Sequence, residues 1–374
     1  MKIALSGGHL TPALAFLDYL KESESPHCCV FFGREHAQTK TGQPSHEEEE
    51  VTARGVPFIS FAAGKISTYS IFDVLLAGIQ NCKAFFVALY HLSIEKPDIF
   101  LSFGTYMAVP LGYAAWVLGI PVVTHEQTRS IGFATKALSP LARKIFLSFP
   151  DSLAHVPKHK SEVTGNLLRS SLTPKIEVAP SWYHNPQELP ILYVTGGSQG
   201  SEVINTCVGR LVPKLTKEYV VIHQCGSTSK MRSYSAELAQ LRATLSKNQQ
   251  NHYVIQEWLS AEELGWLYAH ATLVVSRAGA NTVQELATFQ VPSILIPLPF
   301  AHNQEQLVNA QWLSQAGGAE LIEQKDLTAE LLFEKIALIR SKHKSYRRKL
   351  SALELPTDAS HRVLQALEAI CAGK

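Results

Sequence analysis

The chain has 374 residues, of which 46% are hydrophobic and 18% charged, and its formal net charge is +2. This length exceeds one ordinary domain and predicts two. The hydrophobic fraction and the balanced charge together indicate neither a disordered chain nor a nucleic acid partner. Residues 1–8 carry no long apolar run that would mark a signal peptide, so a cytoplasmic location is expected.

Short apolar runs alternate with amphipathic stretches in the N-terminal half, which predicts a parallel sheet covered by helices. The predicted strands are Lys2–Ser6, Cys28–Phe32, Pro57–Phe61, Ile99–Ser102, Val122–Thr124 and Lys144–Leu147. The predicted helices are Leu10–Leu20, Ile71–Ile94, Ala108–Leu118 and Gly132–Leu138. Residues 37–50, which end in four Glu, are interpreted as a solvated loop or a helix start.

Residues 99–124 contain no Asp, Glu, Lys or Arg and are long enough to span a bilayer. Glycines and prolines divide this stretch into pieces of strand and helix length, at Gly104, Pro110, Gly112, Gly119 and Pro121. A buried β-α-β segment is therefore predicted rather than a membrane helix.

A polar segment with prolines at 174, 180, 186 and 190 predicts a linker over 166–190. The alternation then restarts. The predicted strands are Ile191–Thr195, Tyr219–Gln224, Tyr253–Glu257, Thr272–Ser276, Ser293–Pro297 and Ala319–Ile322. The predicted helices are Glu202–Leu215, Lys230–Leu245, Ala261–Ala269, Asn281–Thr288 and Glu305–Ala316.

The fold class is therefore expected to be α/β, with two doubly wound Rossmann-like domains facing a cleft. The expected domains are residues 1–165 and residues 191–345. A C-terminal helix over 346–374 could pack back on the N-terminal domain. In such folds ligands bind at the loops that follow the strands.

Six cysteines, at 28, 29, 82, 207, 225 and 371, form no Cys-x-x-Cys pair. We expect reduced, mostly buried thiols and neither a disulfide framework nor a zinc site.

Three glycine-rich loops follow predicted strands and open predicted helices. They are Ser6-Gly7-Gly8-His9, Thr195-Gly196-Gly197-Ser198-Gln199-Gly200 and Ser276-Arg277-Ala278-Gly279-Ala280-Asn281. Backbone N–H groups and the helix dipole favour an anion at such positions, although a tight turn alone explains any single loop. Three of them directed at one cleft favour a phosphorylated ligand.

The class of phosphate chemistry is narrowed by missing motifs. No G-x-G-x-x-G follows a strand and no G-x-x-x-x-G-K-[ST] occurs, so dinucleotide redox chemistry and P-loop hydrolysis lack their fingerprints. None of the six Asp stands in D-x-D, so no aspartate pair is available to hold a metal on a nucleotide diphosphate. Helix N-termini and Arg277 would then balance a leaving diphosphate, and no metal or other cofactor is expected.

Residues 196–200 also match the nucleophile elbow G-x-S-x-G, with Ser198 as nucleophile. Asp326 or Asp358 and His343 or His361 could complete a hydrolase triad. A complete α/β domain precedes the elbow and no His-Gly-Gly oxyanion motif lies near a third strand, which makes a serine hydrolase the weaker interpretation.

Seven segments are similar, in order and spacing, to those of one known family. They are Gly7–Ala15, Gly104–Tyr106, Gly119–Gln127, Gly165–Asn166, Val194–Gly200, Ser276–Leu286 and Asn303–Ala310. On these segments the chain resembles MurG, a family of inverting GT-B glycosyltransferases. The resemblance implies transfer of N-acetylglucosamine from UDP-GlcNAc to undecaprenyl-diphosphate-MurNAc-pentapeptide (lipid I), which gives lipid II for peptidoglycan, and hence roles in cell shape and division.

The resemblance also implies roles for residues of the C-terminal domain, which would bind UDP-GlcNAc. Glu285 would accept hydrogen bonds from the ribose hydroxyls, and Trp258 and Leu259 would lie near the uracil. Ser198 and Gln199 would lie at the diphosphate, and Gln304 and Gln306 at the GlcNAc hydroxyls. Gly197, Gly200, Arg277 and Gly279 complete the expected donor site.

The N-terminal domain would take lipid I. The expected acceptor site consists of Gly7, Gly8, Tyr106, His125, Glu126, Gln127, Asn166 and Arg169. His9 is the candidate base for the acceptor hydroxyl, or alternatively it orients a phosphate or caps the following helix. His125 and Glu126 could instead form a structural hydrogen-bonded pair.

The family resemblance further implies peripheral contact with the cytoplasmic face of the membrane, beside other cell-wall enzymes. The apolar residues concerned are Ile71, Phe72, Leu75, Leu76, Phe85 and Phe86. Lys65, Lys83 and Lys96 are thinly spread around them, so electrostatic anchoring would be weak. A helix buried against its own sheet is the alternative.

The acceptor half departs from the family pattern at four places, among them Thr135, where the family has Asn, and Leu167, where it has Pro. Leu5 runs directly into Ser6-Gly7-Gly8-His9, which is shorter than the family's Gly-Gly-Thr-Gly-Gly-His. His125-Glu126-Gln127 is followed by Thr128, where the family has Asn. These departures leave open a second interpretation, a catalytically impaired nucleotide-sugar-binding scaffold of cell-wall synthesis.

Overall fold

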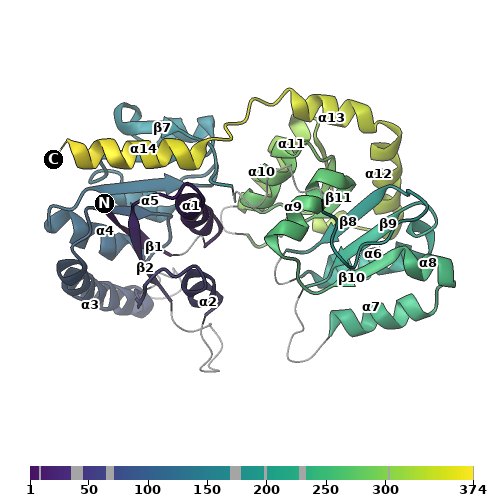
Figure 1. The fold of residues 1–374 in the computed structure, drawn as a ribbon, viewed down its shortest axis with the longest axis horizontal. Helices are drawn as coiled ribbons and strands as arrows, with labels where there is room; N and C mark the ends of the chain where they lie inside the picture. The colour runs from purple at the N-terminus through teal and green to yellow at the C-terminus, as the bar shows by residue number, and fades with distance from the viewer. Residues whose placement is uncertain are drawn as a thin grey trace. The chain divides into compact units, whose positions relative to one another are not determined.

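The computed structural model describes residues 1–7, 10–34, 45–64, 71–168, 178–197, 200–226, 233–301 and 304–373. The chain forms two compact units, one of Met1–Ser170 with Pro356–Lys374 and one of Ser171–Leu355 (Figure 1). Each unit is built on one parallel sheet with helices packed against it. The predicted α/β class, with two doubly wound Rossmann-like domains, is confirmed.

The sheet of the first unit has the strand order β3-β2-β1-β4-β5-β6-β7. Its strands are β1 (Lys2–Ser6), β2 (Cys28–Gly33), β3 (Phe58–Ser60), β4 (Ile99–Ser102), β5 (Val122–Glu126), β6 (Lys144–Leu147) and β7 (Ser161–Val163). Its helices are α1 (Leu10–Glu22), α2 (His46–Thr52), α3 (Ile71–Glu95), α4 (Ala108–Val117), α5 (Phe133–Leu138) and α14 (Ala359–Ala372). The order reverses between β1 and β4, the point at which doubly wound sheets bind ligands.

The central strand β1 has three apolar, fully buried residues, Ile3, Ala4 and Leu5, because both faces of the sheet are covered. Ile3 and Leu5 pack with Phe16 of α1 and Val363 of α14 on one face. Ala4, between them, packs on the other face with the helices α3 and α4. The return of the chain after Pro356 therefore completes one layer of the first unit, where α14 lies beside α1 (Figure 1).

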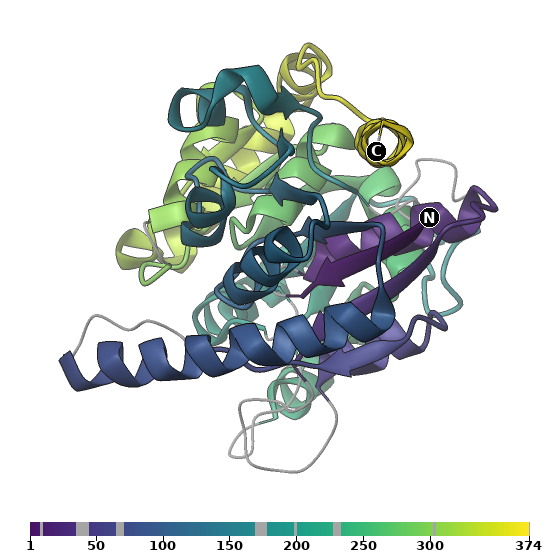
Figure 2. The same ribbon diagram turned by 90° about the vertical axis from the view of Figure 1, so that its left-hand side faces the viewer.

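The charge-free stretch 99–124 folds as β4, α4 and β5, so the prediction of a buried β-α-β segment is confirmed. Within the described residues, one helix is long and apolar enough to cross a membrane by length and composition, over Asp73–Glu95 of α3. Figure 2 shows α3 as one long uninterrupted helix.

The sheet of the second unit has the strand order β10-β9-β8-β11-β12-β13, which reverses between β8 and β11. Its strands are β8 (Ile191–Thr195), β9 (Val220–Gln224), β10 (Tyr253–Gln256), β11 (Ala271–Ser276), β12 (Ser293–Leu295) and β13 (Ala319–Leu321). Its helices are α6 (Glu202–Leu215), α7 (Tyr234–Ala243), α8 (Lys247–Asn251), α9 (Ala261–His270), α10 (Ala280–Thr288), α11 (Glu305–Gln315), α12 (Ala329–Ser341) and α13 (His343–Ser351).

The segment 37–50, predicted as a loop or a helix start, contains the start of α2 at His46, because the Ser45 side chain accepts a hydrogen bond from the Glu48 N–H and caps the helix. Two other expectations are corrected by the structure. The predicted helix Lys230–Leu245 is shorter in its described part: α7 begins after the cap Ser233. All six cysteines are free, but only Cys29, Cys207 and Cys225 are buried.

Candidate active site

The donor candidates of the second unit lie in loops that follow its parallel strands. Gly197 and Gly200 follow β8, and Arg277 and Gly279 follow β11, the neighbouring strand at the reversal of strand order. Ser198 and Gln199 lie outside the described residues. The two glycine-rich loops are therefore adjacent at the point where this class of sheet binds its ligands.

The loop after β8 depends on glycine for its shape. Gly197 has φ +86° and Gly200 has φ +73°, and a Cβ on Gly200 would lie 2.0 Å from the carbonyl oxygen of Cys225. The Gly197 N–H donates to Thr195 Oγ1 at 3.0 Å, and the Gly200 N–H donates to the Gly197 carbonyl at 3.0 Å. Both N–H groups therefore have acceptors within the chain, and α6 begins directly after Gly200 with Ser201 as its cap.

The Arg277 guanidinium ties three segments to the loop after β11. Nη1 donates to the carbonyls of Ile296 and Pro297, at 3.1 and 3.3 Å. Nη2 donates at 2.8 Å both to Ser201 Oγ and to Gln324 Oε1. Burial lowers the pKa of Arg277, yet an arginine remains charged in proteins. Its charge therefore lies at the start of α6, and its Nη groups hold that helix in place.

Glu285 is a buried carboxylate on α10, with 6% of its surface exposed. Its Oε2 accepts a hydrogen bond from Tyr268 Oη of α9 at 3.1 Å. The loop before α10 is held by Asn309 of α11, whose Nδ2 donates to the carbonyl of Ala278 at 3.2 Å. The structure thus brings Glu285 to a fixed position in the helix that opens after the second glycine loop.

The remaining donor candidates differ in exposure. Trp258 is 49% exposed, whereas Leu259 is 5% exposed and packs in the core of the unit. Gln304 is exposed and precedes α11 with φ +53°. Gln306 Oε1 accepts a hydrogen bond from the Leu298 N–H at 3.0 Å. Trp258 and Gln304 therefore expose side-chain surface to solvent, while Leu259 offers mainly its backbone.

The acceptor candidates follow strands of the first sheet at its carboxyl edge. Gly7 follows β1 and Tyr106 follows β4, and Thr105 Oγ1 donates to the Gly7 carbonyl at 3.0 Å. His125 and Glu126 end β5, Gln127 follows them, and Asn166 follows β7. Gly8, His9 and Arg169 lie outside the described residues.

Two charged residues at this edge, Arg34 and Glu47, were not among the predicted site residues. Arg34 follows β2, and its Nη2 donates to Tyr106 Oη while its guanidinium carbon lies 5.2 Å from the centre of the Tyr106 ring. Glu47 in the first turn of α2 accepts from the Arg34 N–H at 2.9 Å. A Cβ on Gly7 would lie 2.1 Å from Glu47 Oε1, so this carboxylate is in contact with the first glycine loop. The feature of the sequence that could have indicated Arg34 is a single arginine directly after an apolar strand.

His125 and Glu126 make different contacts. His125 is buried and its Nε2 lies 3.1 Å from the Gly165 carbonyl. The Glu126 carboxylate accepts from Thr128 Oγ1 at 2.7 Å, from the Thr128 N–H at 3.2 Å and from the Gly132 N–H at 2.9 Å. Glu126 therefore shapes the loop that leads into α5, and Thr128 is its partner.

Gln127 lies beside them with 6% of its surface exposed. Its Oε1 is buried and has no hydrogen-bond partner among the described residues. A buried amide oxygen of this kind is costly unless a donor reaches it, which favours Gln127 as a residue that accepts a hydrogen bond from a ligand.

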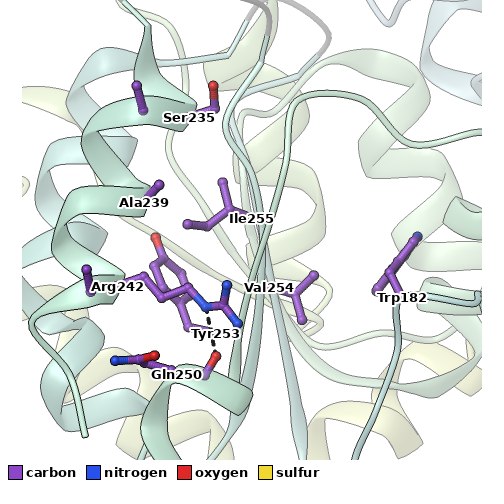
Figure 3. Close-up of a pocket in the computed structure, with 10 residues that line it drawn as sticks. Trp182, Ser235, Ala239, Arg242, Gln250, Tyr253, Val254 and Ile255 are labelled. Carbon is purple, nitrogen blue, oxygen red and sulfur yellow. Dashed lines mark hydrogen bonds between the residues drawn. The ribbon is translucent and has the colours of Figure 1, made fainter. Parts of the chain in front are cut away.

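A groove of about 680 Å³ lies elsewhere in the second unit, beside the edge strand β10 (Figure 3). Trp182, side chains of α7 and the strand residues Tyr253, Val254 and Ile255 line it. Arg242 Nε donates to the Gln250 carbonyl at 2.8 Å at its wall. None of the predicted site residues is among its lining residues, and it is two strands away from the reversal at β8 and β11.

In the described part of the chain, no three His, Cys, Asp or Glu side chains are grouped so that they could hold a metal ion.

Two family models match the chain: the glycosyltransferase family 28 N-terminal domain over residues 6–147 and the C-terminal domain over residues 191–363. Together with the two doubly wound sheets, these matches define a glycosyltransferase of the GT-B class.

Individual relatives narrow the class. The UDP-N-acetylglucosamine–N-acetylmuramyl-(pentapeptide) pyrophosphoryl-undecaprenol N-acetylglucosamine transferase of Clostridium perfringens is 33% identical over 343 residues, covering 91% of this chain and 89% of the relative. The transferase of the same name from Clostridium kluyveri is 29% identical over 373 residues, covering 98% and 99%. The crystal structure of MurG from Acinetobacter baumannii has a TM-score of 0.71 and 26% identity, covering 98% and 99%. The chain therefore belongs to the MurG family of N-acetylglucosamine transferases. The serine hydrolase interpretation is thereby set aside.

Proposed function

We propose that this chain transfers N-acetylglucosamine from UDP-GlcNAc to lipid I, giving lipid II for peptidoglycan. The observation that carries the proposal is the pairing of two glycine-rich loops, after β8 and β11, at the reversal of the second sheet, with buried Glu285 in the helix that follows. Loops at this position, which begin helices, suit the phosphates and ribose of a nucleotide sugar.

The donor site we propose keeps the expected roles of its residues. Glu285 accepts hydrogen bonds from the ribose hydroxyls. Trp258 and the backbone at Leu259 contact the uracil. Gln304 and Gln306 contact the GlcNAc sugar. The diphosphate lies at the loop of Gly197, Ser198, Gln199 and Gly200, with the start of α6. Arg277 and Gly279 support it from the loop after β11, Arg277 through its bond to Ser201.

In the reaction we propose, an acceptor hydroxyl oxygen attacks the anomeric carbon as the bond from that carbon to the β-phosphate oxygen of UDP breaks, with inversion. The hydroxyl proton passes to a base, for which His9 is the candidate. The start of α6 and the Arg277 charge stabilise the leaving diphosphate without a metal. Persistent loss of activity after EDTA treatment and washing would contradict this last point.

The acceptor site we propose lies at the carboxyl edge of the first sheet, with Gly7, Gly8, Tyr106, His125, Gln127, Asn166 and Arg169 in contact with lipid I. Glu126 shapes the neighbouring loop through Thr128 and Gly132. Arg34 joins this set because its cation lies on the Tyr106 ring at the same edge.

Calorimetric titration with UDP and UDP-GlcNAc tests the donor half, and absence of binding at millimolar concentration would refute it. Transfer of radiolabelled GlcNAc to a lipid I analogue tests the whole reaction. One observation favours the scaffold alternative: the Glu47 carboxylate is in contact with Gly7, where it would repel an acceptor diphosphate. Donor binding without transfer would favour that alternative.

We further propose that α3 makes peripheral contact with the cytoplasmic face of the membrane. Leu75, Ile79, Phe86 and Tyr90 of this helix are 60–69% exposed. Exposed apolar side chains on one helix are typical of a surface that binds a bilayer or a partner protein. A cytoplasmic peripheral enzyme that supplies lipid II would act in cell shape and division, beside other cell-wall enzymes.

A further inference from the structure

The carboxyl ends of β8 and β9 share a buried cluster of polar side chains. Thr195 and Gln224 are 5% and 7% exposed, and Tyr193 is 1% exposed. Tyr193 Oη donates to Gln224 Oε1 at 2.5 Å, and Thr195 Oγ1 donates to the same oxygen at 3.2 Å. The amide oxygen of Gln224 therefore receives two hydroxyl groups from the neighbouring strand.

This arrangement sets the direction of the Thr195 hydroxyl. A hydroxyl has a single hydrogen, and here it is given to Gln224. The Thr195 oxygen is then left as an acceptor, and it receives the Gly197 N–H at 3.0 Å. A chain of three groups, Gln224, Thr195 and Gly197, thus runs from β9 into the loop after β8.

The other end of that loop is also held from β9. Gly200 lies so close to the Cys225 carbonyl that a Cβ would lie 2.0 Å from its oxygen, and Asn205 Nδ2 of α6 donates to the same carbonyl at 3.0 Å. Asn205 Oδ1 lies 3.0 Å from Nε2 of His223, and Nδ1 of His223 lies 2.9 Å from Tyr253 Oη. Gly197 is therefore hydrogen-bonded to Thr195, and Gly200 lies in close contact with the Cys225 carbonyl, both through groups of the chain itself.

We propose that Thr195 and Gln224 are positioning residues for the donor diphosphate. Through the Gly197 N–H they hold the backbone at the start of the proposed diphosphate loop before UDP-GlcNAc binds. Gly197 is then positioned on folding, and binding does not have to supply that order. This inference rests on the proposed donor site.

The substitution Thr195→Val removes the hydroxyl and keeps the shape of the side chain. Calorimetric titration should then show UDP bound about tenfold more weakly, the size of effect expected for one lost hydrogen bond. Uridine, which lacks the diphosphate, should keep its affinity within about a factor of two. Thr195→Ser restores a hydroxyl and should recover most of the UDP affinity.

Gln224→Met should likewise weaken UDP binding and leave the affinity for uridine unchanged within about a factor of two. If the two residues act through one chain, the double variant Thr195→Val/Gln224→Met should be no weaker than either single variant. Thr216→Val is the matched control, because Thr216 is a buried threonine of the same unit that donates to the Val212 carbonyl at 2.7 Å, away from the loop. It should leave both affinities unchanged.

Equal weakening of UDP and uridine by Thr195→Val would overturn the inference in favour of a general structural role. Unchanged UDP binding in a folded Thr195→Val variant would overturn it as well. In both cases the wild-type protein still binds UDP, so the proposed function stands. A wild-type protein that binds neither UDP nor UDP-GlcNAc would instead refute the proposed function together with this inference.

Discussion

Glu285 and Tyr268 form a buried pair in which the carboxylate keeps one oxygen bonded to the phenol at 3.1 Å. Glu285→Gln retains an oxygen for Tyr268 but removes the charge that strengthens a hydrogen bond to a ribose hydroxyl. We expect the KM for UDP-GlcNAc to rise by roughly tenfold to a hundredfold, since a hydrogen bond to a charged group contributes about 1.5–3 kcal/mol. Steady-state kinetics over a range of donor concentrations measures this.

The control for Glu285→Gln is Glu262→Gln, an exposed carboxylate in the first turn of α9. It should leave the donor KM unchanged. Unaltered donor kinetics in a folded Glu285→Gln variant would show that another residue receives the ribose.

His223 gives the second unit a defined response to acid. Its imidazole is fully buried between Asn205 and Tyr253, and burial lowers its pKa from 6.5 to about 3. Below pH 6.5 the unfolded chain therefore binds a proton that the folded chain does not. The free energy of unfolding should fall by up to about 1.4 kcal/mol per pH unit as pH decreases from 6.5 towards 3.

Urea unfolding at several pH values tests this dependence. In His223→Gln the fall between pH 6.5 and 3 should be smaller, because the titrating group is gone. His184→Gln, which changes an exposed histidine of the same unit, should keep the wild-type slope. The same slope in all three proteins would contradict the assignment to His223.

At the scale of elements, α3 has two unlike faces. Ala77, Ala84, Ala88 and Leu92 are buried and recur at helical spacing, and the last three pack in a core cluster with residues of α4. Leu75, Ile79, Phe86 and Tyr90 recur with the same spacing on the opposite face and are exposed. A helix simply buried against its own sheet accounts for the first face and not for the second.

The exposed face yields a prediction about the membrane. Leu75→Ser/Ile79→Ser/Phe86→Ser should reduce partitioning onto anionic lipid vesicles at least about tenfold, because apolar area is lost from the contact. Thermal unfolding should change little, since the three side chains are exposed. Vesicle sedimentation measures the partitioning.

The matched variant Val178→Ser/Phe300→Ser removes apolar side chains that are 82% and 90% exposed in the second unit. It should leave sedimentation unchanged. An equal loss of partitioning in both variants would indicate non-specific hydrophobic adsorption and not a membrane-binding helix.

At the scale of the whole molecule, the chain passes between the two units twice, near residue 170 and near residue 355. After the second passage α14 places Val363 and Leu367 in the same core cluster as Phe16 of α1, all fully buried. Arg362 and Glu162 add an ion pair at 2.8 Å between α14 and β7. The last 19 residues, Pro356–Lys374, are therefore part of the fold of the first unit.

Deletion of Pro356–Lys374 should destabilise the first unit by several kcal/mol, at about 1.5–3 kcal/mol for each buried apolar side chain withdrawn from its core. UDP affinity should persist, because the second sheet with all of its strands lies within Ser171–Leu355. Calorimetric unfolding together with UDP titration measures both effects. Deletion of Gly373 and Lys374 alone is the control, and a stable first unit in the longer deletion would contradict the prediction.

The sequence by itself determined the α/β class, most strands and the glycine-rich loops that follow them. The predicted bounds of β1, β4, β6 and β8 agree with the structure because each is a short apolar run that the sheet buries. The glycine-rich loops after β8 and β11 were recognisable for the same local reason, since a strand, a turn and a helix start follow one another in the chain.

Only the tertiary structure decided which groups the charged side chains at the glycine-rich loops contact. Arg277 was expected at a diphosphate, yet its Nη groups bind Ser201, Gln324 and two backbone carbonyls after β12. Glu47 lies against Gly7, some forty residues away along the chain. A parallel sheet places the ends of distant strands side by side, so the partners of a side chain there follow from strand order, which local sequence periodicity does not encode.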